Sequence, residues 1–374
     1  MNYYLIAGEA SGDLHGANLM RALRTEDPSA RFRYWGGDRM AAVDGAPSKH
    51  IRDLAFMGFV EVVQNLPTIL QNFKTVKADI LDFQPDALVL IDYPGFNLRL
   101  AKWAKERGIC VLYYISPQLW AWKAGRLKTI ARTVDWLYVI LPFEENWYRE
   151  RGFERVSFVG HPLLDVFEQY RPAPHFREKN ELDVRPIVAL LPGSRVQEIR
   201  SMLSVMLSVV DDFPDHQFVI AGAPAVERAT YAPFLRTAPN VHLVDNQTYD
   251  LLHHAEAALV TSGTATLETA LVGVPEVVCY RGSRVSYAIA KRLVKVEYIS
   301  LVNLIMNRPV VRELIQQECS TANVRLELEK LLHPDRRLQF KIDYELLRDH
   351  LGGPGASVRT ARSMVARLSE DRAV

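Results

Sequence analysis

The sequence predicts an α/β protein with two doubly wound domains that face each other across a cleft, followed by C-terminal helices. Short apolar runs alternate with segments of helical periodicity through most of the 374 residues, which is typical of βαβ units with a parallel sheet. The alternation breaks at residues 171–176, where two prolines stand two positions apart, and then restarts. Because proline fits neither a helix interior nor a central strand, this segment is a linker candidate between two Rossmann-like domains.

The first half of the chain has strands expected at residues 3–7, 32–35, 87–91, 111–115, 137–140 and 157–159. Helical periodicity fills the gaps, at residues 14–24, 62–83, 98–106, 126–133 and 144–151. The runs at 88–91 and 111–115 are continuously apolar, as buried parallel strands are. We expect this half to form one domain, residues 1–170.

The second half repeats the pattern, with strands expected at residues 187–191, 217–221, 241–244, 257–260 and 276–280. Helices are expected at 198–210 and 266–272, and the chain is mainly helical from about residue 321. A glycine- and proline-rich turn at 351–355 precedes a last helix at 357–368. We expect a second domain at residues 184–345 and a terminal segment, residues 346–374, that packs back on the N-terminal domain.

The composition argues against several classes of protein. Hydrophobic residues make up 48% of the chain and charged residues 24%, and 45 basic against 44 acidic side chains give a net charge of +1. A disordered chain has lower hydrophobicity and higher net charge, and a nucleic-acid binder that works through a broad basic field has an excess of Lys and Arg. The three cysteines are far apart in the sequence and outside any Cys-x-x-Cys pair, which suits a reducing compartment and no structural zinc.

Targeting and membrane-spanning signals are absent from the sequence. The N-terminus has no basic region before its short apolar run, so no signal peptide is expected. The longest uncharged stretches, at residues 108–122 and from residue 257 up to Glu268, are shorter than the roughly 20 residues that a membrane-spanning helix needs. We expect a cytoplasmic protein, with attachment to a membrane surface left open.

The loop after the first expected strand, Gly8-Glu-Ala-Ser-Gly-Asp-Leu-His-Gly16, combines small and polar residues. Its spacing fits neither a dinucleotide-binding Gly-x-Gly-x-x-Gly loop nor a P-loop. A strand-to-helix turn that merely needs glycine is the alternative to a functional loop, but the density of polar side chains favours function. We take Glu9 and Ser11 from this loop as candidate catalytic residues.

Asp92 directly follows the expected buried strand at 87–91. This places a carboxylate at the carboxyl end of a strand, where ligands of doubly wound folds bind. Partial desolvation there would raise its pKa and make it a better general base. Capping of the next helix is the structural alternative. Asp92 is the third candidate catalytic residue.

Two loops of the second domain predict a site for a nucleotide diphosphate. In Leu191-Pro-Gly-Ser-Arg195 the chain turns into a helix, and an arginine can pair with phosphate through its planar guanidinium group. In Thr261-Ser-Gly-Thr-Ala-Thr-Leu-Glu268, hydroxyls and free N–H groups gather at a helix start, which favours anions. A carboxylate one turn later can bind the paired hydroxyls of a ribose. The candidate ligands are Ser194, Arg195, Ser262, Gly263, Thr264 and Glu268, with Arg281 and Arg284 after the next strand.

Metal-binding patterns are missing. The sequence contains no Asp-x-Asp motif and no His-x-x-x-His pair, which favours a mechanism without a metal or other cofactor. His161 lies in Gly160-His-Pro162, where a packed turn residue is the more common case and catalysis the alternative.

Apolar residues recur at helical spacing from Phe56 to Phe73. The simpler interpretation of this periodicity is an ordinary helix that faces the core. The alternative is a surface that accepts acyl chains or rests on a bilayer. Two large aromatic residues in Ser116-Pro-Gln-Leu-Trp-Ala-Trp122 follow another expected strand. The candidates for acceptor, acyl or membrane contact are Met57, Phe59, Val60, Val63, Leu66, Leu70, Phe73, Trp120 and Trp122.

Ordered motifs run from about residue 7 to residue 320. They are Ala7-Gly-Glu-Ala-Ser-Gly-Asp13, Met57-Gly-Phe-Val-Glu61, Asp92-Tyr-Pro-Gly-Phe-Asn97, Ser116-Pro-Gln-Leu-Trp-Ala-Trp122, Leu141-Pro-Phe-Glu144, Val159-Gly-His-Pro162, Leu191-Pro-Gly-Ser-Arg195, Ser262-Gly-Thr-Ala-Thr-Leu-Glu268, Ala290-Lys-Arg-Leu-Val294, Tyr298-Ile-Ser-Leu-Val-Asn-Leu304 and Leu314-Ile-Gln-Gln-Glu-Cys319. Together and in this order they resemble the lipid-A-disaccharide synthase family, whereas Pro-Gly-Ser-Arg alone would indicate only a general glycosyltransferase domain.

The resemblance implies an inverting glycosyltransferase of the two-Rossmann-domain kind called GT-B. The family joins UDP-2,3-diacylglucosamine to 2,3-diacylglucosamine 1-phosphate (lipid X), giving the β-1,6-linked lipid A disaccharide 1-phosphate and UDP. By resemblance, Asp92 is the general base on the acceptor's 6-hydroxyl and Arg195 lies near the diphosphate. Glu268 then binds the UDP ribose, and Asn303 lies on the UDP side.

The resemblance also bears on binding partners and on cellular localisation. It implies a cytoplasmic enzyme bound peripherally to the inner membrane, with two lipid substrates, no cofactor and no nucleic-acid partner, and it leaves a homodimer open. After Asp92 the sequence reads Tyr93-Pro-Gly95 where many members have Ala-Pro-Asp, so the surroundings of the base differ here.

Two alternatives differ in class. A UDP-N-acetylglucosamine 2-epimerase has the same architecture, would act without an acceptor and would need no acyl-binding surface. A non-catalytic nucleotide-sugar-binding or membrane-scaffolding protein is the alternative outside enzymes, and the concentration of Asp92, Arg195 and Glu268 at strand ends argues against it.

Overall fold

The computed structural model describes residues 1–54, 66–122, 124–224, 226–236, 239–282 and 296–373. The chain forms two compact units, of which the first combines Met1–Asp165 with Leu351–Val374 and the second is Val166–His350. The chain passes from the first unit to the second between Asp165 and Val166 and returns to the first unit at Leu351. The proline-rich segment lies within the second unit, where the backbone N–H of Ala173 donates to Asp250.

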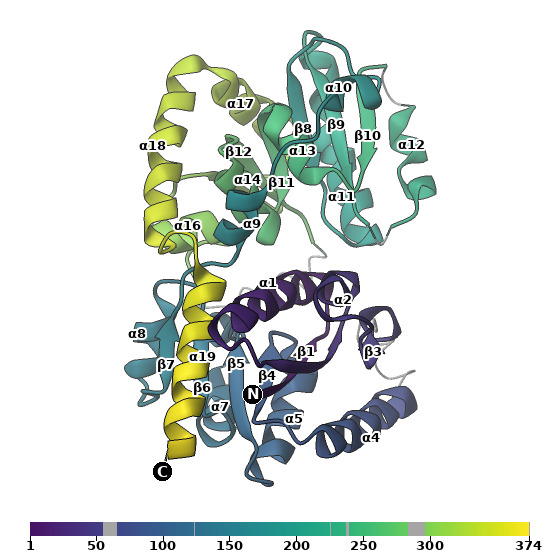
Figure 1. Ribbon diagram of the computed structural model, residues 1–374. Helices are drawn as coiled ribbons and strands as arrows, with labels where there is room; N and C mark the ends of the chain where they lie inside the picture. Colours follow the sequence, from purple (N-terminus) through teal and green to yellow (C-terminus); the bar gives the residue numbers. More distant parts are fainter. Residues whose placement is uncertain (55–65, 123, 225, 237–238, 283–295, 374) are drawn as a thin grey trace. The chain divides into compact units, whose positions relative to one another are not determined.

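The first unit is built on a seven-stranded sheet whose strands all run parallel (Figure 1). Each strand expected in this half is present, with ends within one residue of the expected ones. The short strand β3 is the addition, because two residues carry no readable period. The strand order is β3(Lys49–His50), β2(Arg31–Gly36), β1(Asn2–Ala7), β4(Ala87–Ile91), β5(Cys110–Tyr114), β6(Trp136–Val139) and β7(Val156–Phe158).

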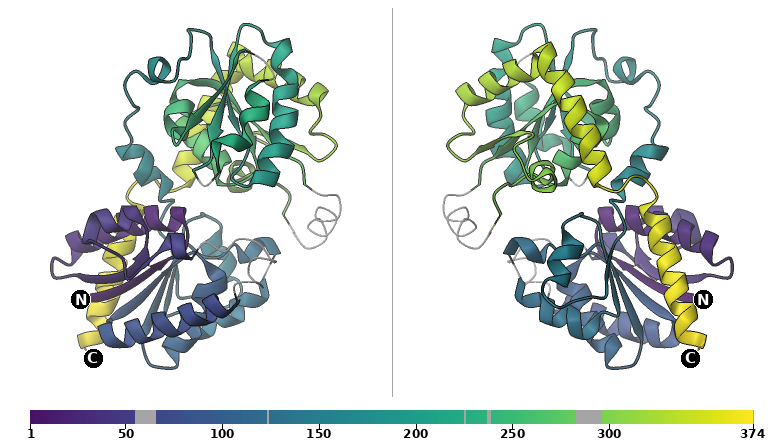
Figure 2. Two further views of the ribbon diagram at one scale, coloured as in Figure 1. Left: turned by 90° about the vertical axis from the view of Figure 1, so that its right-hand side faces the viewer. Right: turned by 90° about the vertical axis from the view of Figure 1, so that its left-hand side faces the viewer.

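Helices cover both faces of this sheet because successive buried residues of its strands point to opposite sides. Tyr4 faces the core under α4(Leu66–Phe83), α5(Pro94–Lys105), α7(Leu127–Thr133) and α8(Glu144–Arg149). Tyr3 faces the core under α1(Ala10–Glu26), α2(Asp38–Asp44) and α19(Ala356–Ala373). The C-terminal helix α19 lies beside α1, so both ends of the chain form this layer (Figure 2).

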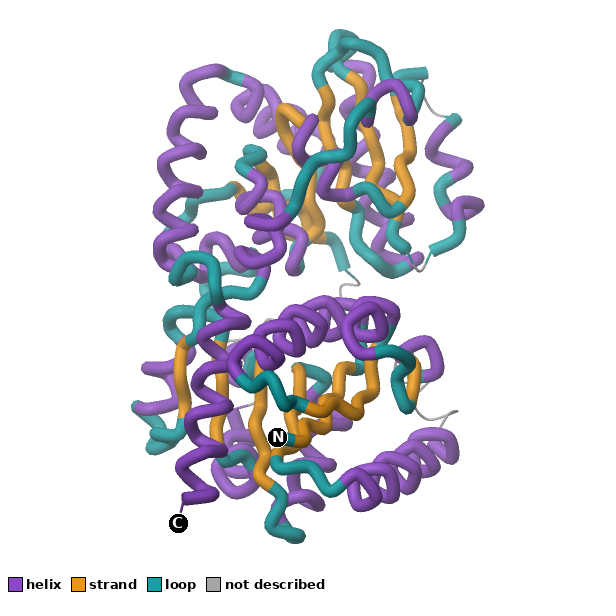
Figure 3. The backbone as a smooth tube through the Cα atoms, viewed as in Figure 1, coloured by secondary structure: helices purple, strands orange, loops and turns teal. Residues whose placement is uncertain are grey.

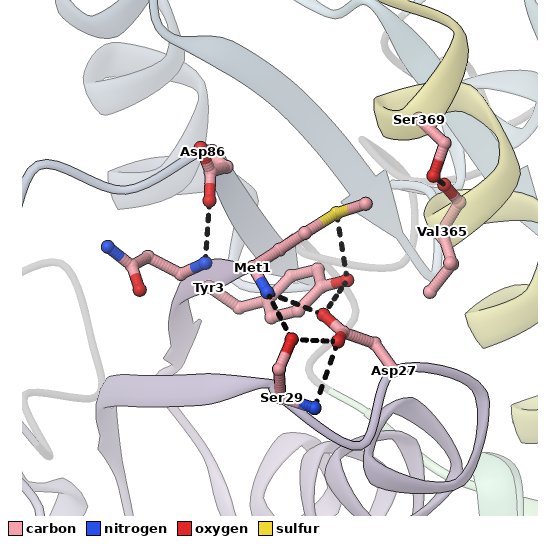
Figure 4. Close-up of polar contacts among 8 residues, drawn as sticks. Met1, Tyr3, Asp27, Ser29, Asp86, Val365 and Ser369 are labelled. Atoms are coloured by element: carbon pink, nitrogen blue, oxygen red, sulfur yellow. Dashed lines mark hydrogen bonds and ion pairs between the residues drawn. The ribbon is translucent and has the colours of Figure 1, made fainter. Parts of the chain in front are cut away.

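Polar contacts hold the start of β1 in place (Figure 4). The Met1 amino group donates to Asp27 at 2.6 Å, and Asp27 also accepts from the Tyr3 hydroxyl. The backbone N–H of Asn2 donates to Asp86 at 2.7 Å. These bonds join the first strand to the end of α1 and to the turn before β4.

The second unit contains a six-stranded parallel sheet covered by helices on both faces (Figure 3). Its strand order is β10(Val241–Asp245), β9(Gln217–Gly222), β8(Ile187–Leu191), β11(Ala255–Thr261), β12(Glu276–Tyr280) and β13(Arg312–Ile315). The longer helices are α11(Val196–Met206), α13(Thr248–His254), α14(Thr264–Val272), α17(Thr321–Leu332) and α18(Pro334–His350). Strand β13 escapes sequence prediction, because its short Arg-Glu-Leu-Ile run is half polar. The α/β class with two Rossmann-like sheets is confirmed.

Each sheet has one point where the strand order reverses, between β1 and β4 and between β8 and β11. Open α/β sheets bind their ligands outside the carboxyl ends of the strands at such a switch point. Ala7 pairs with Ile91 at the ends of β1 and β4, so the loops that carry Glu9 and Asp92 leave the sheet side by side. Leu191 pairs with Val260 in the second sheet, which brings the two predicted nucleotide loops together in the same way. Among the described residues, no helix is long and apolar enough to cross a membrane.

Candidate active site

Asp92 lies directly after β4 at the switch point of the first sheet. Asp92 and Tyr93 both have left-handed backbone conformations, with φ of 45° and 50°, which is uncommon for residues other than glycine. Burial raises the pKa of Asp92 to about 6, and the negative charge of Glu9 adds to this effect. A carboxylate with a pKa near neutrality, held in a strained turn, has the properties of a general base.

The backbone carbonyl of Asp92 is fixed by two side chains. The Tyr113 hydroxyl donates to it at 2.6 Å and the Asn97 amide donates to it at 2.7 Å. Both side chains are buried, and Asn97 also donates to the carbonyl of Ile91. These bonds fix the backbone of the strained turn without using the Asp92 carboxylate.

The polar residues of the first loop have two kinds of environment, because some are exposed and one is buried in a capping contact. Glu9 and Ser11 are exposed at the start of α1. Glu9 is close enough to raise the pKa of both Asp92 and Tyr93 through its charge. Asp13 is buried and accepts backbone N–H bonds from Gly37, Arg39 and Met40. It therefore caps α2, which explains part of the polar density of this loop.

The second sheet carries a pocket of about 320 Å³ at its switch point. Residues predicted from both nucleotide loops line it, namely Ser194, Ser262, Gly263, Thr264 and Glu268. The Ser262 hydroxyl donates to the carbonyl of Ile299 at 2.9 Å, so this side chain also fixes the loop. Thr264 begins α14, and the helix N-terminus favours an anion.

The Glu268 carboxylate is held by Tyr249, which the sequence does not predict as a site residue. The Tyr249 hydroxyl donates to the Glu268 carboxylate at 2.7 Å. Burial raises the pKa of Glu268, while the bond from Tyr249 opposes that rise. Glu198, Thr248 and the loop at residues 221–224 also line the pocket without having been predicted. This loop could have been predicted as part of the pocket from its position directly after strand β9.

Of the predicted arginine ligands, the two that the structure describes, Arg195 and Arg281, do not line this pocket. Arg195 is 70% exposed and pairs with Glu198 at 3.1 Å. Arg281 donates to the carbonyl of Cys319 at 2.7 Å, and Arg284 lies outside the described residues. Both described guanidinium groups already have protein partners, so contact with a phosphate requires them to turn away from those partners.

The Asn303 side-chain amide binds other parts of the protein and does not face the pocket. It is 1% exposed, and its side chain donates to Val311 and Glu313 and accepts from the Val311 N–H. Glu313 in turn binds the backbone N–H groups of Ile299 and Ser300. Asn303 thus positions the loop that receives the Ser262 hydroxyl, one residue removed from the pocket wall.

The predicted acyl or membrane contacts are described only in part. Leu70 is 56% exposed, whereas Phe73 stacks on Phe96 at a centroid distance of 4.2 Å. Trp120 donates its indole N–H to Glu144 at 3.1 Å. The remaining predictions fall outside the description: Met57, Phe59, Val60 and Val63 as residues, and Leu66 and Trp122 in their side chains.

His161 has a structural environment. It is buried, its Nδ1 accepts from the Leu163 N–H, and burial lowers its pKa to about 3. A neutral imidazole with this bond suits the packed turn that the sequence favours. Within the described parts of the chain, no group of three or more His, Cys, Asp or Glu residues is placed to hold a metal ion.

The family model described as lipid-A-disaccharide synthetase matches residues 3–364. The chain belongs to the lipid-A-disaccharide synthase family. The synthase of Syntrophus aciditrophicus is 43% identical over 366 residues, covering 96% of this chain and 95% of the relative. That of Trichlorobacter lovleyi is 40% identical over 373 residues, covering 98% and 97%. Membership of the lipid-A-disaccharide synthase family implies nucleotide-sugar and lipid substrates.

Solved structures support the fold. A co-structure of S. aureus MnaA with UDP has a TM-score of 0.70 at 12% identity, covering 98% of this chain and 97% of that one. UDP-GlcNAc 2-epimerase from Neisseria meningitidis has a TM-score of 0.64 at 15% identity, covering 99% and 100%. At such low identity these structures share the fold alone. The epimerase alternative is therefore not favoured over the lipid-A-disaccharide synthase family.

Proposed function

We propose that this chain joins UDP-2,3-diacylglucosamine to 2,3-diacylglucosamine 1-phosphate, giving the β-1,6-linked disaccharide 1-phosphate and UDP. The observation that carries this proposal is Asp92, a partly buried carboxylate at the switch point of the first sheet, whose pKa desolvation raises to about 6. Family membership supplies the substrates, and this carboxylate supplies the chemistry that the acceptor hydroxyl needs.

In the proposed reaction, Asp92 takes the proton of the acceptor's 6-hydroxyl as that oxygen attacks the anomeric carbon of the donor. The bond from this carbon to the UDP oxygen breaks in the same step, so the configuration inverts. Glu9 raises the proton affinity of Asp92 through its charge. Positioning of the reactants and a base with a matched pKa both lower the barrier of such a displacement.

The pocket of the second unit is the proposed UDP site. Glu268, oriented by Tyr249, binds the ribose hydroxyls, and the N-terminus of α14 with Ser262 and Thr264 receives the diphosphate. Arg195 and Arg281 turn from their protein partners to the departing phosphates. Preorganised N–H groups and guanidinium groups can stabilise this leaving charge without a metal ion.

Peripheral contact with the cytoplasmic face of the inner membrane is part of the same proposal. The exposed Leu70 on α4 supports it, because an apolar side chain at the surface can enter the boundary of a bilayer. Changing Leu70 to Ser should reduce sedimentation of the protein with vesicles that contain anionic phospholipids. Unchanged sedimentation would remove Leu70 from the contact.

Release of UDP tests the function. The protein is incubated with the acylated donor, with and without the acylated acceptor, and release should require both lipids. Asp92→Asn should abolish release and leave the affinity for UDP, measured by calorimetry, nearly unchanged. Release at the wild-type rate by Asp92→Asn would exclude Asp92 as the base, and conversion of UDP-N-acetylglucosamine without an acceptor would revive the epimerase.

A further inference from the structure

The first unit contains a second, more apolar pocket of about 240 Å³ between α4 and α5. Ile69 and Phe73 line it from α4, and Phe96 lines it from α5. An apolar cavity of about 150 Å³ is enough to admit benzene, so this space can hold several carbons of a hydrocarbon chain. All of its lining residues belong to the first unit.

Tyr93 connects this pocket to the proposed base. Its ring lines the pocket, and its backbone follows Asp92 directly. The ring lies 5.8 Å from that of Phe96, and the charge of Glu9 acts on both Tyr93 and Asp92. A ligand in the pocket therefore lies against the residue that directly follows the proposed base in the sequence.

Gly95 leaves the pocket open. A Cβ built on Gly95 would meet no atom within 4 Å, although Gly95 lines the pocket. Its backbone does not require glycine, because it lies in the first turn of α5 without a positive φ. The absent side chain therefore leaves room at this wall of the pocket.

Arg99 gives the pocket a positive charge. It lies four residues after Gly95 on α5, lines the pocket and is exposed. Within the described part of the chain, its guanidinium group forms no ion pair. An apolar space beside an unpaired cation fits an amphiphilic anion, in which a hydrocarbon chain and a phosphate stand close together.

We propose that this pocket holds one acyl chain of the acceptor, with Arg99 on the acceptor's phosphate. The inference rests on the proposed function. In 2,3-diacylglucosamine 1-phosphate the phosphate and the nearest acyl chain leave the sugar from adjacent carbons, C1 and C2. The 6-hydroxyl is carried through C6 on C5, which lies across the ring from C2. The acceptor can therefore place its chain and phosphate at α5 while its nucleophile reaches Asp92, and the open space at Gly95 sets the length of chain that fits.

The binding test uses octyl phosphate as the probe, with inorganic phosphate and octyl glucoside as comparisons, in calorimetric titrations of the full chain. Gly95→Leu should weaken octyl phosphate and octyl glucoside roughly tenfold by filling the pocket, and Arg99→Gln should weaken only octyl phosphate to that extent. Lys102→Gln, a matched exposed cation on α5 that does not line the pocket, should bind like the wild type. Equal binding of octyl phosphate by Gly95→Leu and wild type would overturn the proposal, as would equal binding of inorganic phosphate and octyl phosphate.

Turnover separates this inference from the proposed function. Gly95→Leu should raise the KM for a long-chain acceptor and leave that for a short-chain acceptor unchanged, whereas Asp92→Asn should bind octyl phosphate like the wild type. Retention of probe binding together with wild-type turnover by Asp92→Asn would overturn the function and leave the pocket standing. Loss of turnover by Asp92→Asn, with no effect of Gly95→Leu on probe or KM, would overturn the pocket alone.

Discussion

The ring of Tyr93 lies against the backbone of Gly8, so closely that a Cβ on Gly8 would come within 2.4 Å of the ring carbons Cγ and Cδ1. The contact joins the loop after β1 to the turn after β4. It leaves no room for any residue but glycine at position 8 while Tyr93 keeps its place. The pairing therefore couples two loops that the sequence presents separately.

Gly8→Ala should displace the Tyr93 ring and, with it, the turn that carries Asp92. We expect the free energy of unfolding to fall by about 1–3 kcal/mol and turnover to fall with it, while UDP affinity stays unchanged. Thermal unfolding and UDP release measure the two effects. The double variant Gly8→Ala/Tyr93→Ala should recover stability, and Gly125→Ala, whose Cβ meets no atom within 4 Å, is the control. Lack of recovery would show that the two residues are not coupled.

The rate should depend on pH through Asp92. Because burial raises its pKa to about 6 and a general base acts only when ionised, kcat/KM should fall about tenfold for each pH unit below 6 and level off above it. Steady-state rates from pH 5 to 8 measure this profile. A kcat/KM that stays level down to pH 5 would mean that the acting base is an ordinary exposed carboxylate.

The same pKa makes a prediction about stability that needs no activity. A pKa raised from 3.8 to about 6 means that the folded state holds the proton more tightly than the unfolded state. The stabilisation is full below pH 3.8 and is lost as pH rises through 6. Asp92→Asn should therefore be more stable than the wild type at pH 8, by on the order of 2 kcal/mol, and similar to it at pH 4. Denaturant unfolding at both pH values provides the measurement, and equal differences at the two would argue against a buried, ionised Asp92.

Tyr113 should act as a positioning residue for Asp92. Tyr113→Phe removes one of the two bonds to the Asp92 carbonyl, so we expect kcat to fall about tenfold with an unchanged KM for the acceptor, and stability to fall by about 1–2 kcal/mol. Tyr4→Phe is a matched control, because it loses a hydroxyl bond to Asp79 at 2.5 Å on the same face of the sheet. The control should lose similar stability and keep its kcat. An equal loss of kcat in both variants would reduce Tyr113 to a purely structural role.

Tyr249 should contribute to UDP affinity through Glu268. Tyr249→Phe frees the Glu268 carboxylate from its 2.7 Å bond, and we expect the Kd for UDP to rise roughly fivefold to tenfold. Tyr170→Phe, which removes a hydroxyl bond to Asp250 in the same unit, should leave that Kd unchanged. Calorimetric titration with UDP compares the two, and an unaltered Kd in Tyr249→Phe would separate Glu268 from the nucleotide site.

The sequence predicts the strands well because parallel strands buried on both faces are continuous apolar runs, as at 88–91. It brings the two loops of the second unit to one pocket because both follow strands that are neighbours in the sheet. It cannot tell which polar residue of a loop faces the ligand. Asp13 and Glu9 stand in the same motif, yet Asp13 caps α2 while Glu9 acts on Asp92. That division depends on α2, a neighbour set by the tertiary fold.

The sequence does not predict hydrogen-bond partners that are distant from one another along the chain. Glu268 is predictable as a polar residue one turn into a helix, but Tyr249 reaches it from another helix. Asn303 belongs to a motif, yet its amide is consumed by Val311 and Glu313. A motif therefore does not distinguish a residue that binds the ligand from a residue that holds another part of the protein in place.

Asp165 holds the start of α19 through three backbone N–H bonds, from Gly355, Ala356 and Ser357, at 2.5, 3.1 and 2.9 Å. Asp165→Ala should cost about 1–3 kcal/mol, because it leaves these donors without a partner. Hydrogen exchange of the amides at residues 355–360 should accelerate. Asp82→Ala, which breaks an exposed pair with Arg33, should cost less than about 0.5 kcal/mol. Similar losses in both variants would contradict the capping role.

The placement of α19 has a consequence for biosynthesis. Met364 and Leu368 of α19 lie in the core that contains Tyr3 and Leu5 of the first strand, so part of the first unit is missing until α19 has been translated. Once Asp165 has been translated, the nascent first unit has an open apolar face until α19 follows, and the second unit is complete only when His350 has been translated. Truncated products that lack α19 should therefore expose the first sheet to chaperones and proteases, although the nucleotide pocket in them has folded.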